Sequence, residues 1–175
     1  MESTSGLTCR VPLKTKLPDA YCARWQDETV MREIVQKYRT IALVGISANS
    51  QRPSYFVGAY LKHHGLDIIP VNPGQKEILG VPCYPSLEAI PRSVDVVDVF
   101  RRADQVMPIV DSAIAIQAKA IWFQFEVINI DAGELAEKNG LQVVMDRCLK
   151  IEHGRYSGGL HMAGMNTGII SARKA

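Results

Sequence analysis

The chain has 175 residues, of which 47% are hydrophobic and 22% are charged, and its net charge is +2. This length suits one domain with one sizeable core, and the composition is ordinary for a globular protein. So small a charge, without a run of basic residues, argues against a nucleic-acid-binding protein. No apolar stretch is long enough to cross a membrane, and the first ten residues lack the apolar core of a signal peptide. We therefore expect a cytoplasmic protein without a membrane partner.

The cysteines are too scattered to form a recognisable site. There is no C-x-x-C pair among Cys9, Cys22, Cys83 and Cys148, so the sequence supports neither a zinc centre nor a disulfide framework. The histidines have no acid or cysteine at ligand spacing either, and we expect no metal site. Without a basic neighbour in sequence, Cys83 and Cys148 are interpreted as buried structural thiols.

In chain order, residues 1–24 come first and contain Pro12, Pro18 and a Ser/Thr-rich start. We expect a loosely attached arm, pinned at its end by Tyr21 and Trp25. A helix pattern begins at Asp27, which is a suitable cap.

After this helix, strands and helices alternate. The sequence predicts strands at 41–46, 67–71, 94–100, 120–125 and 141–145, and helices at 53–64, 105–117, 132–139 and 148–153. Between them we expect a hairpin-like piece at 78–84 and a brief helix from Ser86 to Ile90. The stretch from Ile41 to Ile46 is apolar without alternation, which is typical of a parallel strand covered on both faces. Repeated β-α-β units predict a three-layer α/β/α domain with a mainly parallel sheet of five or six strands over residues 25–153.

The segment 154–175 is rich in glycine but also carries apolar side chains. We interpret it as a tail that packs onto the domain or onto a second subunit, which makes a homodimer a candidate assembly.

The stretch from Ile41 to Val57 carries the strongest functional signal. It combines a buried strand, a glycine turn at Gly45, a polar loop and a helix that begins at Pro53. Helix N-termini offer free N–H groups and a dipole that favours negative charge, so this place is suited to a nucleotide phosphate.

Ligands of open parallel sheets bind beyond the carboxyl ends of the strands. Polar and basic residues follow four of the predicted strands: Gly45, Ser47, Asn49, Arg52 and Ser54; Val71, Asn72, Pro73, Gly74, Gln75 and Lys76; Phe100, Arg101 and Arg102; and Gln124 and Glu126. We expect one of Arg101 and Arg102 to face the cleft and the other to pair with a surface acid.

The ligand is not expected to be an ordinary nicotinamide cofactor. The loop after Gly45 lacks the further glycines of the dinucleotide fingerprint, and Asn72 stands where an acidic residue would hold the ribose. Asn72 is better suited to shaping the turn before Pro73. Asp95 and Asp98 lie in or beside a strand, where we expect sheet-edge hydrogen bonding rather than general-base work.

The strings G-I-S-A-N-S-Q-R-P-S at 45–54, V-N-P at 71–73, Y-P-S-L at 84–87, D-V-V-D-V-F-R-R at 95–102 and M-D-R-C at 145–148 resemble the small bacterial CoA-binding proteins. That family is a stand-alone Rossmann-like domain, similar to the CoA-binding domain of the succinyl-CoA synthetase alpha subunit. The resemblance covers roughly residues 27 to 155.

The resemblance implies coenzyme A or an acyl-CoA as the ligand. It places Gly45, Ser47, Asn49, Arg52 and Ser54, with the adjacent Tyr55, at a phosphate loop. It places Val71, Asn72 and Pro73, with Lys76 nearby, at the adenosine part. Phe100, Arg101 and Gln124 would border the ligand further along.

Two departures from the resemblance matter. The family often has a glycine where Glu126 stands, so this carboxylate is expected to narrow the pocket or to change what the thiol end meets. The synthetase also carries its phosphorylated histidine in a second domain, so its chemistry is not carried over.

No catalytic constellation is visible, which favours a carrier, sensor or regulatory protein. Two alternatives remain: a small enzyme that acts on an acyl-CoA or uses a nicotinamide cofactor in the same pocket, and a ligand-sensing regulator whose DNA contact comes from a partner.

Overall fold

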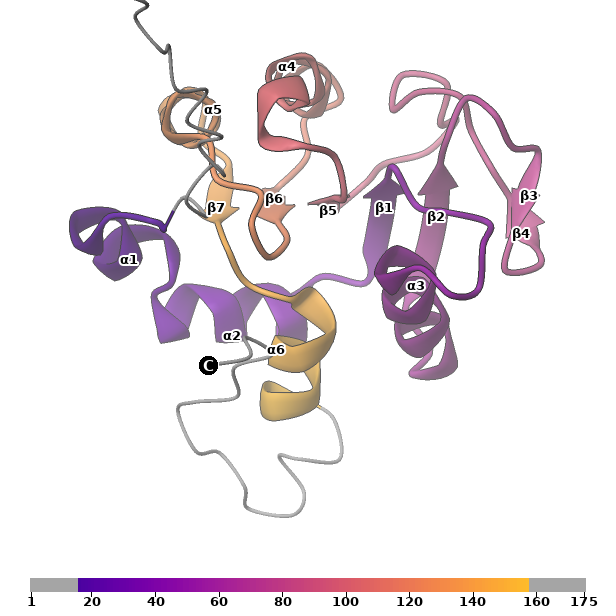
Figure 1. The fold of residues 1–175 in the computed structure, drawn as a ribbon, viewed down its shortest axis with the longest axis horizontal. Coiled ribbons are helices and arrows are strands. Elements are labelled where there is room, and N and C mark those ends of the chain that lie inside the picture. The colour runs from indigo at the N-terminus through magenta and orange to yellow at the C-terminus, as the bar shows by residue number, and fades with distance from the viewer. Residues whose placement is uncertain (1–15, 158–175) are drawn as a thin grey trace, which may run out of the picture.

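A computed structural model describes residues 16–157. Its main sheet has five parallel strands in the order β2-β1-β5-β6-β7. These strands are β1 (Thr40–Val44), β2 (Asp67–Val71), β5 (Val96–Val99), β6 (Ala120–Phe123) and β7 (Gln142–Val144). A two-stranded antiparallel hairpin, β3 (Glu77–Ile78) and β4 (Val81–Pro82), lies beyond β2 (Figure 1). The predicted Rossmann-like α/β fold is confirmed.

Helices cover both faces of the sheet (Figure 1). On one face lie α2 (Glu28–Lys37), α3 (Pro53–His63) and α6 (Leu149–Tyr156), and on the other lie α4 (Met107–Ala115) and α5 (Ile130–Lys138). A short 3-10 helix, η1 (Ala103–Gln105), leads into α4. Each face has its own apolar core, so the sheet is buried on both sides, as the unbroken apolar run at 41–46 predicts for β1.

Local signals explain where several helices begin. Asp27 accepts hydrogen bonds from the N–H groups of Thr29 and Val30 and so caps α2. Asn129 caps α5 in the same way through the N–H of Ala132, which starts this helix two residues earlier than expected. Pro53 occupies the first turn of α3, where its missing N–H costs nothing.

The expectation of a loosely attached arm is wrong for its last residues. Asp19–Trp25 forms helix α1, which Pro18 precedes, because proline is favourable at a helix start as well as disruptive inside one. Leu17 and Trp25 are each only 1% exposed, and the Tyr21 hydroxyl donates to Glu134 of α5. Trp25 and Tyr21 therefore do pin this segment, as predicted.

Two further expectations are corrected. Residues 86–90 form turns rather than a helix, since Ile90 precedes Pro91 and is thereby disfavoured from the helical region. Helix α6 continues to Tyr156, so Gly154 lies inside it and not in a separate tail. The remainder of the tail, and the homodimer that rests on it, fall outside the described residues, and the division of the chain into arm, domain and tail stays a prediction.

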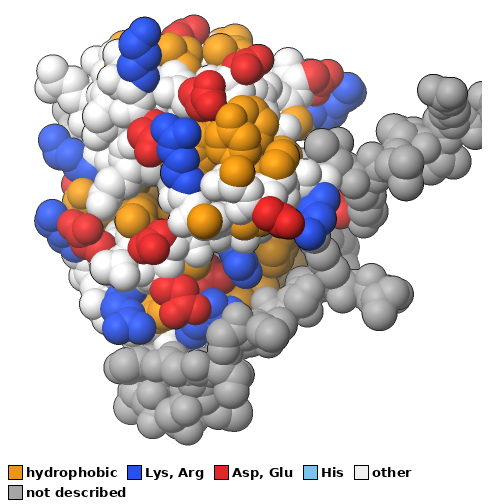
Figure 2. All heavy atoms as spheres, turned by 90° about the vertical axis from the view of Figure 1, so that its left-hand side faces the viewer, with side chains coloured by type: hydrophobic (Ala, Val, Ile, Leu, Met, Phe, Trp, Pro, Cys, Tyr) orange, Lys and Arg blue, Asp and Glu red, His pale blue; other side chains and the backbone are white. Residues whose placement is uncertain are grey.

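The surface of the described residues carries mixed charge. Figure 2, which views the side of the molecule with α1, shows acidic and basic side chains interspersed around small apolar patches. None of the described helices has the length and hydrophobicity needed to span a membrane.

The packing of α1 gives a first prediction. A Cβ on Gly133 of α5 would lie 2.5 Å from the buried ring of Trp25, closer than atoms can approach. We expect Gly133→Ala to lower the free energy of unfolding by about 1–3 kcal/mol, as overpacked cores do. Urea unfolding followed by circular dichroism measures this. Gly74→Ala is the matched control, since its Cβ would meet nothing nearer than 3.5 Å; an equal loss in both variants would contradict the explanation.

Candidate functional site

The candidate site lies where β1 and β5 meet, at the carboxyl edge of the sheet. The chain leaves β1 toward β2 on one side and reaches β5 on the other, so the strand order reverses direction at this point. In open α/β sheets such a switch point opens a crevice for a ligand. Two cavities occupy it, one on each face of the sheet edge.

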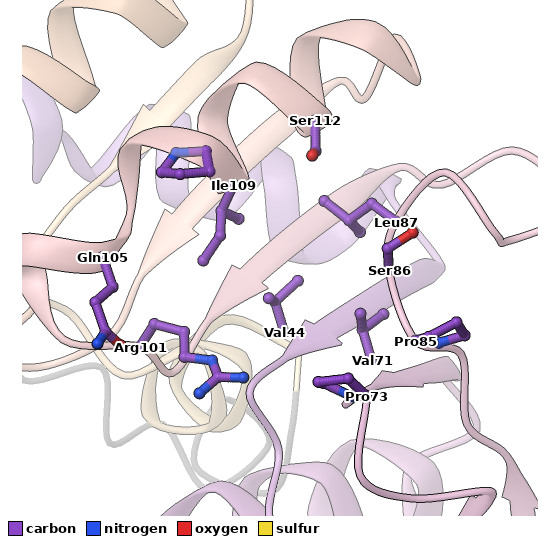
Figure 3. Close-up of a pocket in the computed structure, with 11 residues that line it drawn as sticks. Val44, Val71, Pro73, Pro85, Ser86, Leu87, Arg101, Gln105, Ile109 and Ser112 are labelled. Atoms are coloured by element: carbon purple, nitrogen blue, oxygen red, sulfur yellow. The ribbon is translucent and has the colours of Figure 1, made fainter.

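The first cavity, of about 310 Å³, lies on the face covered by α4. Figure 3 shows Arg101 reaching into it from the end of β5, opposite Val44 and Val71. Its remaining wall comes from Pro73, from Pro85, Ser86 and Leu87 after the hairpin, and from Gln105, Pro108, Ile109 and Ser112.

The second cavity, of about 610 Å³, lies on the face covered by α3 and α6. Its wall is mostly apolar, with Phe100, Phe125 and Val57 among its residues, and Arg52 and Glu126 carry charge there. The other lining residues are Gly45, Ser47, Pro53, Ser54, Gln124, Val127 and Cys148.

Gly45 and Arg101 stand between the two cavities. Gly45 has φ +85°, a backbone conformation that favours glycine. A Cβ here would also lie 3.1 Å from Cδ and Nε of Arg101. Glycine therefore lets the Arg101 side chain lie directly against the end of β1, where the first cavity opens.

The loop between β1 and α3 is fixed by its own side chains. The N–H of Ser47 donates to Ser54 Oγ over 3.1 Å, and the N–H of Asn49 donates to Ser47 Oγ over 3.1 Å. The N–H of Gln51 donates to Asn49 Oδ1 over 2.9 Å. These three N–H groups therefore have partners within the loop and at the start of α3. Their hydrogen bonds hold the loop in place beside the start of α3.

Asn72 ties the ends of two strands together. Its Nδ2 donates to the carbonyl of Ile46 over 2.8 Å, and its Oδ1 accepts from the N–H of Gly74 over 2.9 Å. This confirms the turn-shaping role predicted for Asn72. The prediction for the two neighbouring arginines is also confirmed: Arg101 faces the cavity, whereas Arg102 pairs with Asp104 over 2.7 Å.

Nine of the thirteen predicted site residues line one of the two cavities. They are Gly45, Ser47, Arg52, Ser54, Phe100 and Gln124 in the second cavity, and Val71, Pro73 and Arg101 in the first. Asn49 and Asn72 instead shape the adjoining turns, Tyr55 is partly buried and lines a different cavity with Lys62 and Leu79, and Lys76 lines neither cavity.

The sequence did not predict the residues from η1 and α4 that line the first cavity. Gln105, Pro108 and Ile109 come from η1 and α4, which follow β5 directly. A signal was present, because Pro108 stands in the first turn of α4 just as Pro53 does in α3.

Asp98 corrects another expectation. It lies in β5, at the centre of the sheet rather than at its edge, and it is 0% exposed. Gln124 Nε2 lies 2.8 Å from its Oδ1 and 3.1 Å from its Oδ2. Burial raises the pKa of Asp98 to about 8, although the Gln124 hydrogen bond opposes this shift. Asp95 does bond at the end of the sheet as predicted, through the N–H groups of Arg39 and Thr40.

Cys148 is buried, as predicted, but it also lines the second cavity. Burial raises the pKa of its thiol, and the nearby Asp98 carboxylate adds to this rise. The thiol therefore stays protonated, the less nucleophilic form. Cys83 is only half-buried, so the prediction of a buried thiol is wrong for it, although burial still raises the pKa of its thiol.

Comparison with known proteins agrees with the resemblance noted in the sequence. The profile of the family described as CoA binding domain matches residues 39–154. The chain belongs to this family. This CoA-binding family member is 36% identical over 123 residues to the uncharacterized protein YneT of Bacillus subtilis (strain 168), covering 70% of the chain and 91% of YneT. A solved structure from Pyrococcus horikoshii OT3 is 37% identical and superposes with a TM-score of 0.72, covering 89% of this chain and 99% of that one.

A larger relative is the ADP-forming acetate–CoA ligase I of Archaeoglobus fulgidus, which is 28% identical over 121 residues. The match covers 63% of the CoA-binding family member but only 18% of the ligase. The ligase activity as a whole therefore does not follow from this similarity.

Proposed function

We propose that the protein binds coenzyme A or an acyl-CoA across the two cavities. The observation that carries this proposal is their arrangement: two cavities of different character adjoin at Gly45 and Arg101, at the switch point of a CoA-binding-family domain. CoA has a matching design, with a charged nucleotide part and a long, weakly polar pantetheine arm.

The chemistry of each cavity assigns the two parts. The nucleotide would occupy the first cavity, where the Arg101 guanidinium reaches in and Val44, Val71 and Ile109 supply apolar walls. The arm would pass Gly45 into the second cavity, which is larger and mainly apolar. Arg52 and the positive end of α3 stand beside that passage and favour the diphosphate there.

We further infer that the protein holds this ligand as a carrier, sensor or regulator without converting it, with the cytoplasm as the expected compartment. Cys148 supports this inference because its thiol stays protonated inside the second cavity, which disfavours attack on a thioester.

Thermal unfolding tests the ligand. Near saturation, at about 100 times the dissociation constant, a ligand adds about 2.7 kcal/mol to stability, or roughly 5–10 °C in a domain of this size. We expect this shift with CoA and acetyl-CoA and none with NAD or NADP. A shift with the nicotinamide cofactors alone would overturn the proposal. Release of free thiol from acetyl-CoA at a steady rate would overturn the non-catalytic role while leaving the ligand in place.

A further inference from the structure

Gln124 places a polar group on the wall of the otherwise mainly apolar second cavity. Gln124 is a buried residue, only 7% exposed, and its Nε2 is held by both carboxyl oxygens of Asp98. A side-chain amide is planar, so the hydrogen bonds that hold Nε2 toward Asp98 also fix the direction of Oε1. In the part of the chain that the structure describes, Oε1 accepts no hydrogen bond and is not fully buried, which leaves it available to an occupant of the cavity.

A carboxyl group is energetically unfavourable at the buried position of Asp98. It sits in β5 between Leu43 of β1 and Trp122 of β6, with no exposed surface. An apolar side chain would cost far less there, as its neighbours Val96, Val97 and Val99 show. Packing alone therefore does not account for a carboxyl group whose side chain bonds to Gln124.

We propose that Gln124 is a specificity-determining residue that accepts a hydrogen bond from an amide N–H of the CoA pantetheine arm, and that Asp98 is the positioning residue that turns its Oε1 toward the cavity. This inference rests on the proposed function. The arm is the part of CoA that offers neutral amide N–H donors, and these are stronger donors than a thiol. The nucleotide part binds elsewhere and does not depend on Gln124.

The positioning depends on the charge of Asp98. An ionised carboxylate accepts from Nε2 through either oxygen, whereas a protonated carboxyl keeps one acceptor oxygen and gains an O–H donor that competes for Oε1. The titratable group that faces this pair at the N-cap of α6 is the Cys148 thiol, and β1 and β6 place the apolar Leu43 and Trp122 beside it. Arg52 and Glu126 are the charged residues that line the same cavity as Gln124. Because burial raises the pKa of Asp98 to about 8, the amide orientation should change across the range from pH 7 to 9.

The experiment compares dissociation constants for CoA and for 3′-phosphoadenosine 5′-diphosphate, which is CoA without its arm. Their ratio isolates the contribution of the arm. At pH 9 we expect Gln124→Met to lower this ratio about tenfold, the worth of one buried hydrogen bond, while the nucleotide affinity changes less than about twofold. Asp98→Leu should give the same loss through misplacement of Gln124, and its melting temperature shows whether the fold is kept.

Asp98→Asn is the conservative variant that separates positioning from packing. Asparagine keeps an acceptor for Nε2, carries a donor as the protonated carboxyl does, and does not titrate, so the arm contribution should be the same at every pH. In the wild type it should rise about fivefold from pH 7 to pH 9, as the ionised fraction grows. The CoA thiol ionises equally in both proteins and is thereby controlled.

The outcomes separate the two levels of the proposal. A wild-type protein that binds neither CoA nor its nucleotide part overturns the proposed function, and this inference with it. If CoA binds but Gln124→Met weakens both ligands equally, or neither, the role of Gln124 is overturned alone. The same pH slope in the wild type and in Asp98→Asn overturns the positioning role of Asp98.

Discussion

Asp98→Asn should make the protein more stable above neutral pH and should flatten its stability between pH 4 and pH 8. The folded-state pKa of Asp98 is raised from 3.8 to about 8 by burial, so the folded protein holds a proton that the unfolded chain releases. The stabilisation from this proton is complete below pH 4 and is lost as pH rises through 8. Four pKa units correspond to a loss on the order of 5 kcal/mol across the window. Asparagine fills the same space and stays neutral, so the variant should lose no free energy of unfolding from this position between pH 4 and pH 8.

Urea unfolding at half-unit steps from pH 5 to pH 9 measures this effect in both proteins. The difference between the two curves isolates Asp98 from other groups, such as His153, whose pKa is lowered by burial and whose contribution appears as pH falls. In thermal unfolding at pH 8.5, the melting temperature of the variant should be higher than that of the wild type by about 10 °C or more. Parallel curves would show that Asp98 is already ionised in the folded protein.

Arg101→Met should weaken CoA binding by about 10- to 100-fold, the worth of the charge-assisted hydrogen bonds that a guanidinium makes with a phosphate. Arg101 reaches into the first cavity and has no ion pair with the described residues, so its charge is available to a ligand. Methionine keeps most of the apolar side chain that lies against Gly45.

The adjacent arginine supplies a matched control. Arg102 has the same charge but pairs with Asp104 at the surface, so Arg102→Met should change CoA affinity less than about twofold. Both variants alter net charge equally, which cancels long-range effects. Isothermal titration calorimetry at two salt concentrations measures the affinities. Equal losses in the two variants would show that overall charge, and not a contact by Arg101, governs binding.

Much of the fold could be predicted because local patterns and tertiary demands agree. The five strands of the sheet are mainly apolar segments, and Asp27 and Pro53 mark helix starts by their own chemistry. Helix α1 was not predictable by the same reasoning. Its seven residues are held by Trp25, whose ring fits over Gly133, and that contact joins segments more than a hundred residues apart.

The candidate site likewise contains residues that the sequence can predict and residues that it cannot. Residues that directly follow β1 and β5, such as Gly45 and Arg101, could be found from strand ends alone. Leu87 and Ile109 could not, because they join the first cavity only when the segment after the hairpin folds against α4. Asp98 was assigned to an edge because sequence does not give strand order, and its central place in the sheet is what buries it.

Under the proposed function, the placement of the two cavities on opposite faces of one sheet edge would make the protein a bivalent receptor for a single flexible molecule. A ligand that fills both must bend over the end of β1 at Gly45, so a rigid molecule of the same length can occupy only one. The nucleotide and the pantetheine arm, supplied as separate fragments, should bind side by side without competing. Joining them raises the effective concentration of the second part once the first is bound. Affinity should therefore depend on the linker between the two parts as much as on either one.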